Sequence, residues 1–382
     1  MNSFAVLALA LSLSFALSAE TVLDVTGVGA EKIPVEINVG ASAFAKSLKK
    51  NLELSGAFVV KQGGEVKVSG SSGALSANGR GKSLSLPVAF SDEKSQRMAA
   101  RKLSDAMCEA FAKQKGFALD RIAFVSKKGK SVSELCVAYP DGYDIRQLTS
   151  NGKTVVGPRW KDDSTIFYTG IVNAGPQIWE FDTNTERRKL RWSFKGLSTG
   201  ASVSPDGQRV AIILSFQGNP ELYVIHMASS KWTRLTTTPL ASEGQPAWSP
   251  DGTKIVYVSD ETRRPQLYVI DVATKAKRRL TSRGSQNVDP DWGSDGRIAY
   301  ITKRGGAQIA VMDPKVGESS VKLVTEPGSW EHPSWARDNR NIVAGRDKAL
   351  FVVDTELQFD KPVKPRQVFH AQGNWINPSW SR

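Results

Sequence analysis

The stretch QPAWSPDGTKIVYVSD, residues 245–260, decides the fold of this chain. A first extended segment ends at Trp248, the tetrad SPDG makes a turn, and Lys254–Ser259 reads as a second strand. The Asp-Gly pair supplies the positive φ that a tight hairpin needs. The stretch therefore predicts one strand–turn–strand unit built around a large aromatic side chain.

Variants of this unit recur along the C-terminal two thirds of the chain. They align on one position at steps of 43, 45, 44, 43 and 45 residues, and the position holds Trp160, Val203, Trp248, Trp292, Trp335 and Trp380. A period in the forties with four short strands per unit is typical of a β-propeller. The tryptophan is the plug that packs one blade on the next.

The two ends of the repeat array predict how the ring closes. The last unit, NPSWSR at 377–382, has no second strand. The first unit begins with RIAFVS at 121–126, which matches the second-strand phrase KIVYVS and has no first strand before it. We therefore expect the C-terminal segment to be the inner strand of the blade that starts at Ile122. Six blades result, and the ring has no free edge.

The chain before residue 121 has a different character. Residues 1–19 carry no charged side chain, and an apolar run from Phe4 to Leu17 is followed by small residues, which predicts a cleaved secretory signal peptide. A retained N-terminal anchor is the alternative. Residues 20–120 alternate strands with helices, one over 43–55 and one that starts at Ser91 as its N-cap. The fold class is an α/β N-terminal domain followed by an all-β six-bladed β-propeller over 121–382.

Composition and motifs limit the chemistry. The net charge of +13 favours acidic partners, but basic runs without interleaved aromatic residues do not indicate nucleic acid. Cys108 and Cys136 read as two isolated buried thiols, with a long-range disulfide as the alternative, and no spacing indicates a metal site. The tract DPDWGSDG at 289–296 leaves a cation at the channel mouth open, although it lacks the spacing of an EF-hand loop.

One motif raises the possibility of an enzyme. GLSTG at 196–200 matches the G-x-S-x-G elbow of hydrolases, which needs a buried strand before the serine and a helix after it. Here the motif lies in the loop that leads to an inner strand, so we interpret it as a chance match. No catalytic, cofactor-binding or metal-binding residue is predicted.

The order of these parts resembles the TolB family, the periplasmic components of Tol-Pal systems. The resemblance rests on the apolar leader, the small α/β domain and the P-x-W-S-P-D-G repeats, and it covers the whole mature chain; the repeat alone is shared with prolyl oligopeptidase-like propellers. It implies a non-enzymatic periplasmic adaptor, a monomer peripheral to the membranes. In that family the propeller binds the peptidoglycan-associated lipoprotein Pal. The extended N-terminus engages the inner-membrane protein TolA, and the system serves outer-membrane integrity and invagination during cell division. A propeller-based periplasmic hydrolase or carbohydrate-binding protein is the alternative.

Two regions are predicted to bind partners. The first is an extended N-terminal segment that can add to a sheet edge, with a plain edge strand of the small domain as the alternative. It comprises Glu20, Thr21, Val22, Leu23, Asp24 and Val25.

The second region is the set of loops that lead into the inner strands, because every blade has the same polarity and these loops open on one face. Its candidate residues are Glu243, Gln245, Asn287, Asp289, Trp330, Glu331, His332, Trp375 and Asn377. Trp330 and Trp375 each lie five residues before a repeat tryptophan, so the scaffold does not obviously need them, and tryptophan is enriched in binding hot spots. Packing between neighbouring loops is the alternative for both.

Overall fold

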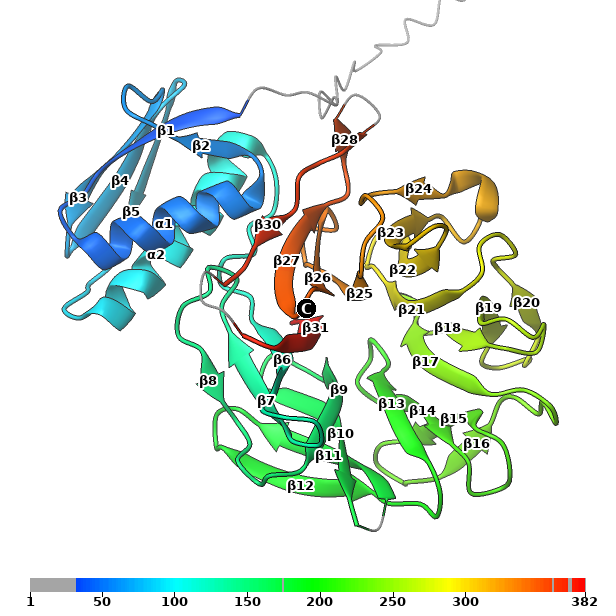
Figure 1. Ribbon diagram of the computed structural model, residues 1–382. Helices are drawn as coiled ribbons and strands as arrows, with labels where there is room; N and C mark the ends of the chain where they lie inside the picture. Colours follow the sequence, from blue (N-terminus) through cyan, green and yellow to red (C-terminus); the bar gives the residue numbers. More distant parts are fainter. Residues whose placement is uncertain (1–31, 174, 359–360, 370–372, 382) are drawn as a thin grey trace, which may run out of the picture.

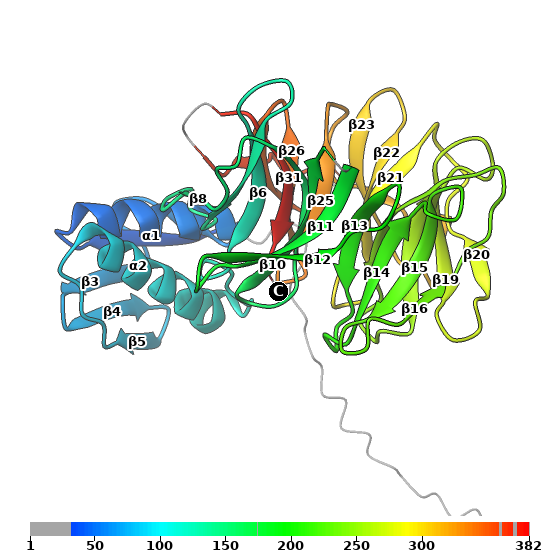
Figure 2. The same cartoon turned by 90° about the horizontal axis from the view of Figure 1, so that it is seen from below.

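A mixed α/β sheet with two helices lies beside a six-bladed β-propeller (Figures 1 and 2). The computed structural model describes residues 32–173, 175–358, 361–369 and 373–381. Both parts agree with the fold class expected from the sequence. The predicted N-terminal binding segment and signal peptide lie outside the described residues.

The N-terminal sheet has the strand order β2-β1-β3-β4-β5, with parallel pairing around β1 and antiparallel pairing beyond it. Helix α1 buries Phe44, Leu48 and Leu52, the side chains that recur every four residues, against this sheet and α2. The elements are β1 (Ile33–Asn38), α1 (Ser42–Ser55), β2 (Phe58–Val60), β3 (Val66–Ser71), β4 (Ala74–Gly79), β5 (Lys82–Leu86) and α2 (Glu93–Met107), which continues as a π-helical turn, Cys108–Ala112.

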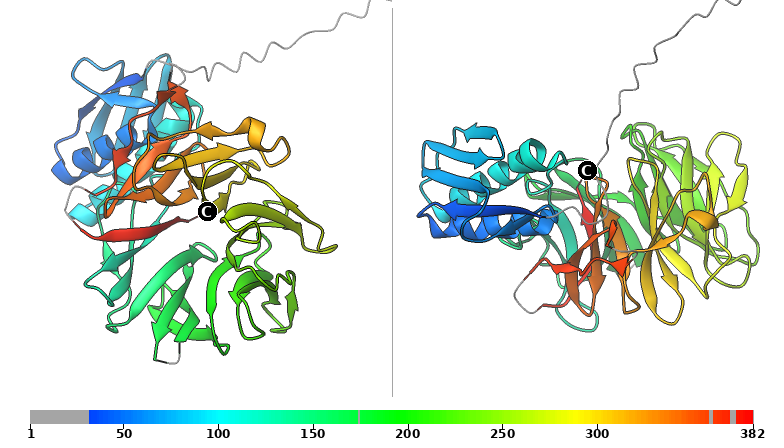
Figure 3. Two further views of the ribbon diagram at one scale, coloured as in Figure 1. Left: turned by 45° about the vertical axis from the view of Figure 1, so that its right-hand side comes forward. Right: turned by 90° about the horizontal axis from the view of Figure 1, so that it is seen from above.

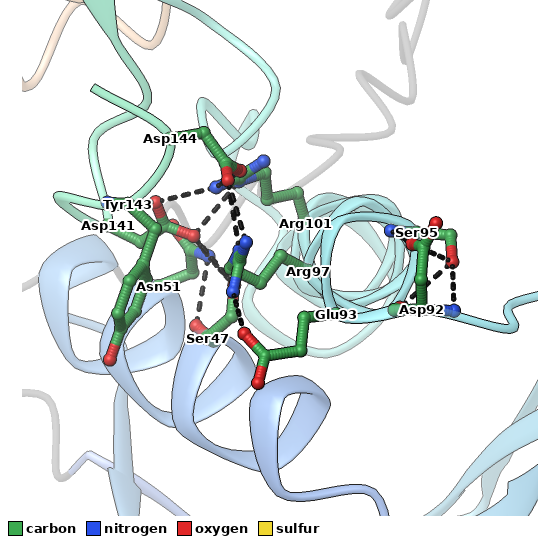
Figure 4. Close-up of polar contacts among 10 residues, drawn as sticks. All are labelled: Ser47, Asn51, Asp92, Glu93, Ser95, Arg97, Arg101, Asp141, Tyr143 and Asp144. Carbon is green, nitrogen blue, oxygen red and sulfur yellow. Dashed lines mark hydrogen bonds and ion pairs between the residues drawn. The ribbon is translucent and has the colours of Figure 1, made fainter. Parts of the chain in front are cut away.

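The start of α2 differs from the prediction by one residue. Asp92, not Ser91, is the N-cap, and its side chain accepts a hydrogen bond from the amide of Ser95 at 2.8 Å (Figure 4). The Ser95 hydroxyl in turn accepts from the Asp92 amide, which completes a capping box. A carboxylate beside the helix N-terminus also interacts favourably with the helix dipole, so aspartate is the stronger cap here.

Each blade of the propeller is a four-stranded antiparallel sheet, and the inner strands surround the axis of the ring (Figure 1). The first blade is β9 (Thr154–Trp160), β10 (Thr165–Val172), β11 (Gly175–Asp182) and β12 (Arg187–Trp192); the second is β13 (Ser198–Val203), β14 (Arg209–Leu214), β15 (Glu221–His226) and β16 (Trp232–Arg234); the third is β17 (Glu243–Trp248), β18 (Lys254–Ser259), β19 (Gln266–Asp271) and β20 (Lys277–Arg279). The fourth is β21 (Asn287–Trp292), β22 (Ile298–Lys303), β23 (Ala307–Met312) and β24 (Lys322–Leu323); the fifth is β25 (Glu331–Trp335), β26 (Asn341–Arg346), β27 (Ala349–Asp354) and β30 (Arg366–Gln367). The sixth is β31 (Trp375–Trp380), β6 (Ile122–Lys127), β7 (Ser133–Ala138) and β8 (Arg146–Gln147), and β28 (Leu357–Gln358) pairs with β29 (Lys361–Pro362) outside the blades.

The ring closes as the sequence predicts. Strand β31 pairs antiparallel with β6, in a register that places Trp380 opposite Ile122 and Trp375 opposite Ser126. The side chain of Trp380 is buried and packs edge-on against Phe117, which follows the N-terminal domain in the chain. The last inner strand therefore joins both ends of the propeller.

The helices of the N-terminal domain hold one loop of the sixth blade (Figures 2 and 3). The Arg101 side chain on α2 is fully buried and donates to both carboxylate oxygens of Asp141 and to Asp144, each at 2.9 Å (Figure 4). From α1, the Ser47 hydroxyl and the Asn51 amide also donate to Asp141. This cluster, which we call the Arg101 clamp, fixes the loop that joins β7 to β8 against both helices.

Two further expectations can be compared with the structure. Cys108 and Cys136 are free, buried thiols, and burial raises the pKa of Cys108 to about 12 and that of Cys136 to about 11. Both thiols therefore stay protonated at neutral pH. Within the described ranges, no helix is both long and apolar enough to cross a membrane.

Candidate functional site

The inner strands share a backbone feature near the face where their preceding loops open. At one equivalent position in each blade φ lies between 48° and 69°, and the pairing with the second strand shifts register there. These positions are Gly157, Gly200, Gln245, Asp289, His332 and Asn377. We call them the axial ring; its polar members come from the third to sixth blades, and its two glycines from the first and second.

Hydrogen bonds connect the four polar members of the axial ring. The Gln245 side chain accepts from the Asp289 amide at 2.9 Å and donates to the Asp289 carboxylate. The other Asp289 oxygen accepts from the His332 amide at 3.1 Å, and the Asn377 side-chain nitrogen lies 3.0 Å from the His332 ring nitrogens. The structure thus brings together four of the predicted binding residues. A left-handed residue lies three positions before each repeat position, which is a tryptophan in every blade but the second. The sequence shows this signal only where glycine occupies the left-handed position.

Glu331, beside the axial ring, and His332, a member of it, have partly exposed side chains. Their side chains are 37% and 27% exposed, and a Glu331 oxygen lies 4.0 Å from the His332 ring. Partial burial raises the pKa of Glu331 above its usual value. This pair offers one carboxyl group and one imidazole to a ligand that approaches along the axis.

The two predicted tryptophans are buried. Trp330 is 2% exposed, packs on Phe351, and donates its indole N–H to the Glu326 carbonyl at 3.1 Å. Trp375 is 8% exposed and packs edge-on against Phe369 with ring centroids 4.5 Å apart. This burial is what the packing alternative predicts, so we expect substitutions at these positions to act through stability. A direct role in partner binding stays a prediction.

The remaining loop residues, Asn287 and Glu243, are also buried at the starts of their strands. The Asn287 amide donates to Gln266 and to the Arg283 carbonyl, both at 2.8 Å, and so fixes the loop before β21.

Glu243 belongs to a pair of carboxyl groups that share one hydroxyl. Thr238 Oγ1 lies 2.8 Å from Glu243 and 3.1 Å from Glu221.

The surroundings of the two carboxyl groups differ, and this difference separates their pKa values. Glu221 also accepts from Arg234, Thr236 and the Thr238 amide. Although burial opposes it, these hydrogen bonds hold the pKa of Glu221 below its usual value. Burial raises the pKa of Glu243 to about 7. Below about pH 7 Glu221 is therefore the anion of the pair and Glu243 the protonated acid.

Replacement of Glu243 by glutamine should flatten the dependence of stability on pH. Glutamate in an unfolded chain titrates near pH ~4.3, and Glu243 in the native protein near 7. The native state therefore binds the extra proton between these values, and its stabilising effect is lost as the pH rises through 7. Between pH 5 and 8 the free energy of unfolding of the natural protein should fall by about 2 kcal/mol. That of Glu243→Gln should not show this fall. Urea unfolding of both proteins at the two pH values measures the difference, and parallel pH profiles would contradict the assignment.

The metal-site and nucleophile-elbow possibilities raised by the sequence can be compared with the described residues. Among the residues that the structure describes, no group of three His, Cys, Asp or Glu side chains could hold a metal ion. Ser198 of the GLSTG motif is buried as the first residue of β13 and leads into that strand, where a nucleophile elbow needs a helix. What the axial ring offers is a fixed set of hydrogen-bonding groups, which suits recognition.

The sequence is similar to a known family and to individual members of it. Residues 108–382 match the family described as "TolB beta propeller domain". The chain is 30% identical over 148 residues to the Tol-Pal system protein TolB of Ruthia magnifica subsp. Calyptogena magnifica, which is 37% of this chain and 35% of that protein. It is 29% identical over 142 residues to that of Desulfosudis oleivorans, covering 37% and 32%. The match thus spans about a third of these relatives' length.

A solved structure extends the likeness to the N-terminal domain. The crystal structure of TolB from Acinetobacter baumannii superposes with a TM-score of 0.79 over 93% of this chain and 98% of that one, at 21% sequence identity. At this identity the likeness shows the fold of both domains.

Proposed function

Because the chain belongs to the TolB β-propeller family, we propose that it is a non-enzymatic adaptor of a Tol-Pal system that binds a protein partner at the axial ring. The observation that carries this proposal is the set of hydrogen bonds that connects the four polar members of the axial ring, Gln245, Asp289, His332 and Asn377. Its members are held before a partner arrives, so a partner meets oriented donors and acceptors at little entropic cost. Glu331 and His332 supply the exposed contacts.

The finer parts of the proposal concern partners and location. We propose that residues 1–19 direct export to the periplasm, that 20–120 and 121–382 form the two mature domains, and that the axial ring binds a Pal-like lipoprotein. The N-terminal segment 20–25 binds a TolA-like inner-membrane protein. Together these contacts serve outer-membrane integrity and invagination during division. The family match, the names of the relatives and the apolar leader support this arrangement.

A pull-down from envelope extract with the mature protein tests the proposal. We expect recovery of a Pal-like lipoprotein. His332→Ala should weaken its binding about tenfold, because an exposed imidazole at the centre of an interface is lost. The matched control is His226→Ala, since His226 is exposed at the end of β15 and is not a member of the ring. A chain without residues 20–25 should keep the lipoprotein and lose the TolA-like protein.

Two outcomes would contradict the proposal. One is the absence of any lipoprotein from the pull-down. The other is equal binding by the His226→Ala and His332→Ala variants, both with unchanged melting temperatures. The second result would place the partner away from the axial ring and leave the family assignment intact.

A further inference from the structure

Arginine–tryptophan stacks join several neighbouring blades on the face opposite the loops of the axial ring. In each stack an arginine at the start of a second strand lies over the repeat tryptophan of the next blade. The guanidinium carbon lies 4.8–5.0 Å from the ring centroid in the pairs Arg121–Trp160, Arg209–Trp248 and Arg297–Trp335. The stack therefore joins the second strand of one blade to the repeat tryptophan of the next.

The same arginines also hydrogen-bond the turn of the next blade. Arg209 donates to the Gly252 carbonyl at 3.0 Å, and Arg297 donates to the Asn339 carbonyl at 2.5 Å. Each of these carbonyls lies four residues after the repeat tryptophan. A planar guanidinium can stack on an indole and donate sideways at once, which a lysine ammonium cannot do.

The junction between the third and fourth blades is built differently. Lys254 stands at the arginine position, as the first residue of β18. The equivalent turn carbonyl, that of Gly296, accepts the indole N–H of its own blade's Trp292 at 2.9 Å. A groove of about 720 Å³ opens between these two blades. Its volume lies in the range of ligand-binding pockets.

The floor of the groove is apolar and its rim is charged. Val269, Trp292 and Pro314 contribute to the floor, and Lys254 and Lys315 lie on the rim. The aspartates of the rim already accept hydrogen bonds from nearby groups: Asp251 from Ser249 and Thr253, Asp271 from Ala273 and Thr274, and Asp295 from Arg297. Lys254 lies near Asp251 and Asp271, and its charge adds to the hydrogen bonds that lower the pKa of both carboxyl groups. Lys315, by contrast, forms no ion pair within the described ranges. The rim therefore offers one unpaired cation, Lys315, besides the ammonium group of Lys254.

We propose that this groove binds a short acidic peptide segment of a partner protein, with an apolar side chain against the floor and a carboxylate beside Lys254 and Lys315. Charge complementarity favours this occupant, since Lys315 has no anionic partner within the described ranges, basic side chains outnumber acidic ones in the lining, and the whole chain carries a net charge of +13. The groove begins where strand β17 ends, whereas the axial ring lies near its start. Two partners could therefore bind at the same time.

Lys254→Arg tests the proposal without loss of charge. We expect the arginine to stack on Trp292 and narrow the groove, as Arg209 stacks on Trp248 at its junction. The probe is the peptide acetyl-Phe-Glu-Glu-amide, titrated by calorimetry into the full mature protein, with acetyl-Phe-Gln-Gln-amide as its neutral counterpart. The natural protein should bind the acidic peptide about tenfold more tightly than the neutral one. Lys254→Arg should weaken acidic-peptide binding about tenfold with no fall in melting temperature.

The matched control is Lys231→Arg, the same substitution at an exposed lysine of the second blade, which should change nothing. A second variant, Lys315→Gln, should weaken the acidic peptide and leave the neutral one unchanged. Equal affinity of the natural protein and Lys254→Arg, equal affinity for the two peptides, or no measurable binding would each overturn the proposal. Lipoprotein capture at the axial ring should be the same for Lys254→Arg, so the two proposals fail independently.

Discussion

A chain without residues 377–382 should not fold cooperatively. These residues supply most of β31, whose partner β6 would become an unpaired edge. The buried Trp380 would also be lost from the core that joins the sixth blade to Phe117. Loss of a buried tryptophan alone costs about 3–5 kcal/mol, against a total stability of roughly 5–15 kcal/mol for a typical domain. The loss of the strand adds to that cost.

Circular dichroism and calorimetry measure this effect. Trp380→Ala isolates the contribution of the side chain, and Trp232→Ala is the matched control, because Trp232 is 43% exposed on the outer strand β16. We expect a large fall in melting temperature for the first substitution and a small one for the second. A truncated chain that melts within a few degrees of the natural protein would show that the ring does not depend on its closing strand.

Arg101→Ala should be the most destabilising single charge substitution in the N-terminal domain. Arg101 and Asp141 are both fully buried, and the guanidinium lies 3.8 Å from the Tyr139 ring centroid in addition to its bonds to Asp141 and Asp144. Removal of one partner leaves a buried charge without compensation, which costs about 3–5 kcal/mol. Arg101→Lys should recover only part of this, since an ammonium cannot reproduce the two parallel bonds to Asp141.

The control for this prediction is Arg80→Ala. Arg80 pairs with Glu65 at 2.7 Å, but both side chains are about half exposed, and such a pair contributes about 1 kcal/mol or less. Urea unfolding of both variants gives the comparison. A double-mutant cycle of Arg101→Ala with Asp141→Asn should show a coupling free energy of at least about 1 kcal/mol. Equal effects of Arg101→Ala and Arg80→Ala would mean that the clamp does not stabilise the domain contact.

The sequence by itself determined the architecture of the propeller. The repeat tryptophans, the Asp-Gly turns and the alternation in segments such as Lys254–Ser259 are local signals, because strand period and turn geometry depend on residues close in the chain. They predicted six blades and closure of β31 on β6, which the register confirms. The helix around Phe44 was predictable as well, because its apolar side chains recur at a local spacing of four residues.

Only the tertiary structure decided which side chains meet. Arg101 and Asp141 are separated by 40 residues, and the members of the axial ring by 43 to 45, so no local pattern predicts their hydrogen bonds. The raised pKa of Glu243 depends on burial by segments that are distant in the chain. The groove beside Lys254 lies at a junction where a lysine stands at the position of the stacking arginines. Burial and pairing are properties of the packed chain, since each depends on contacts that form only when distant segments come together.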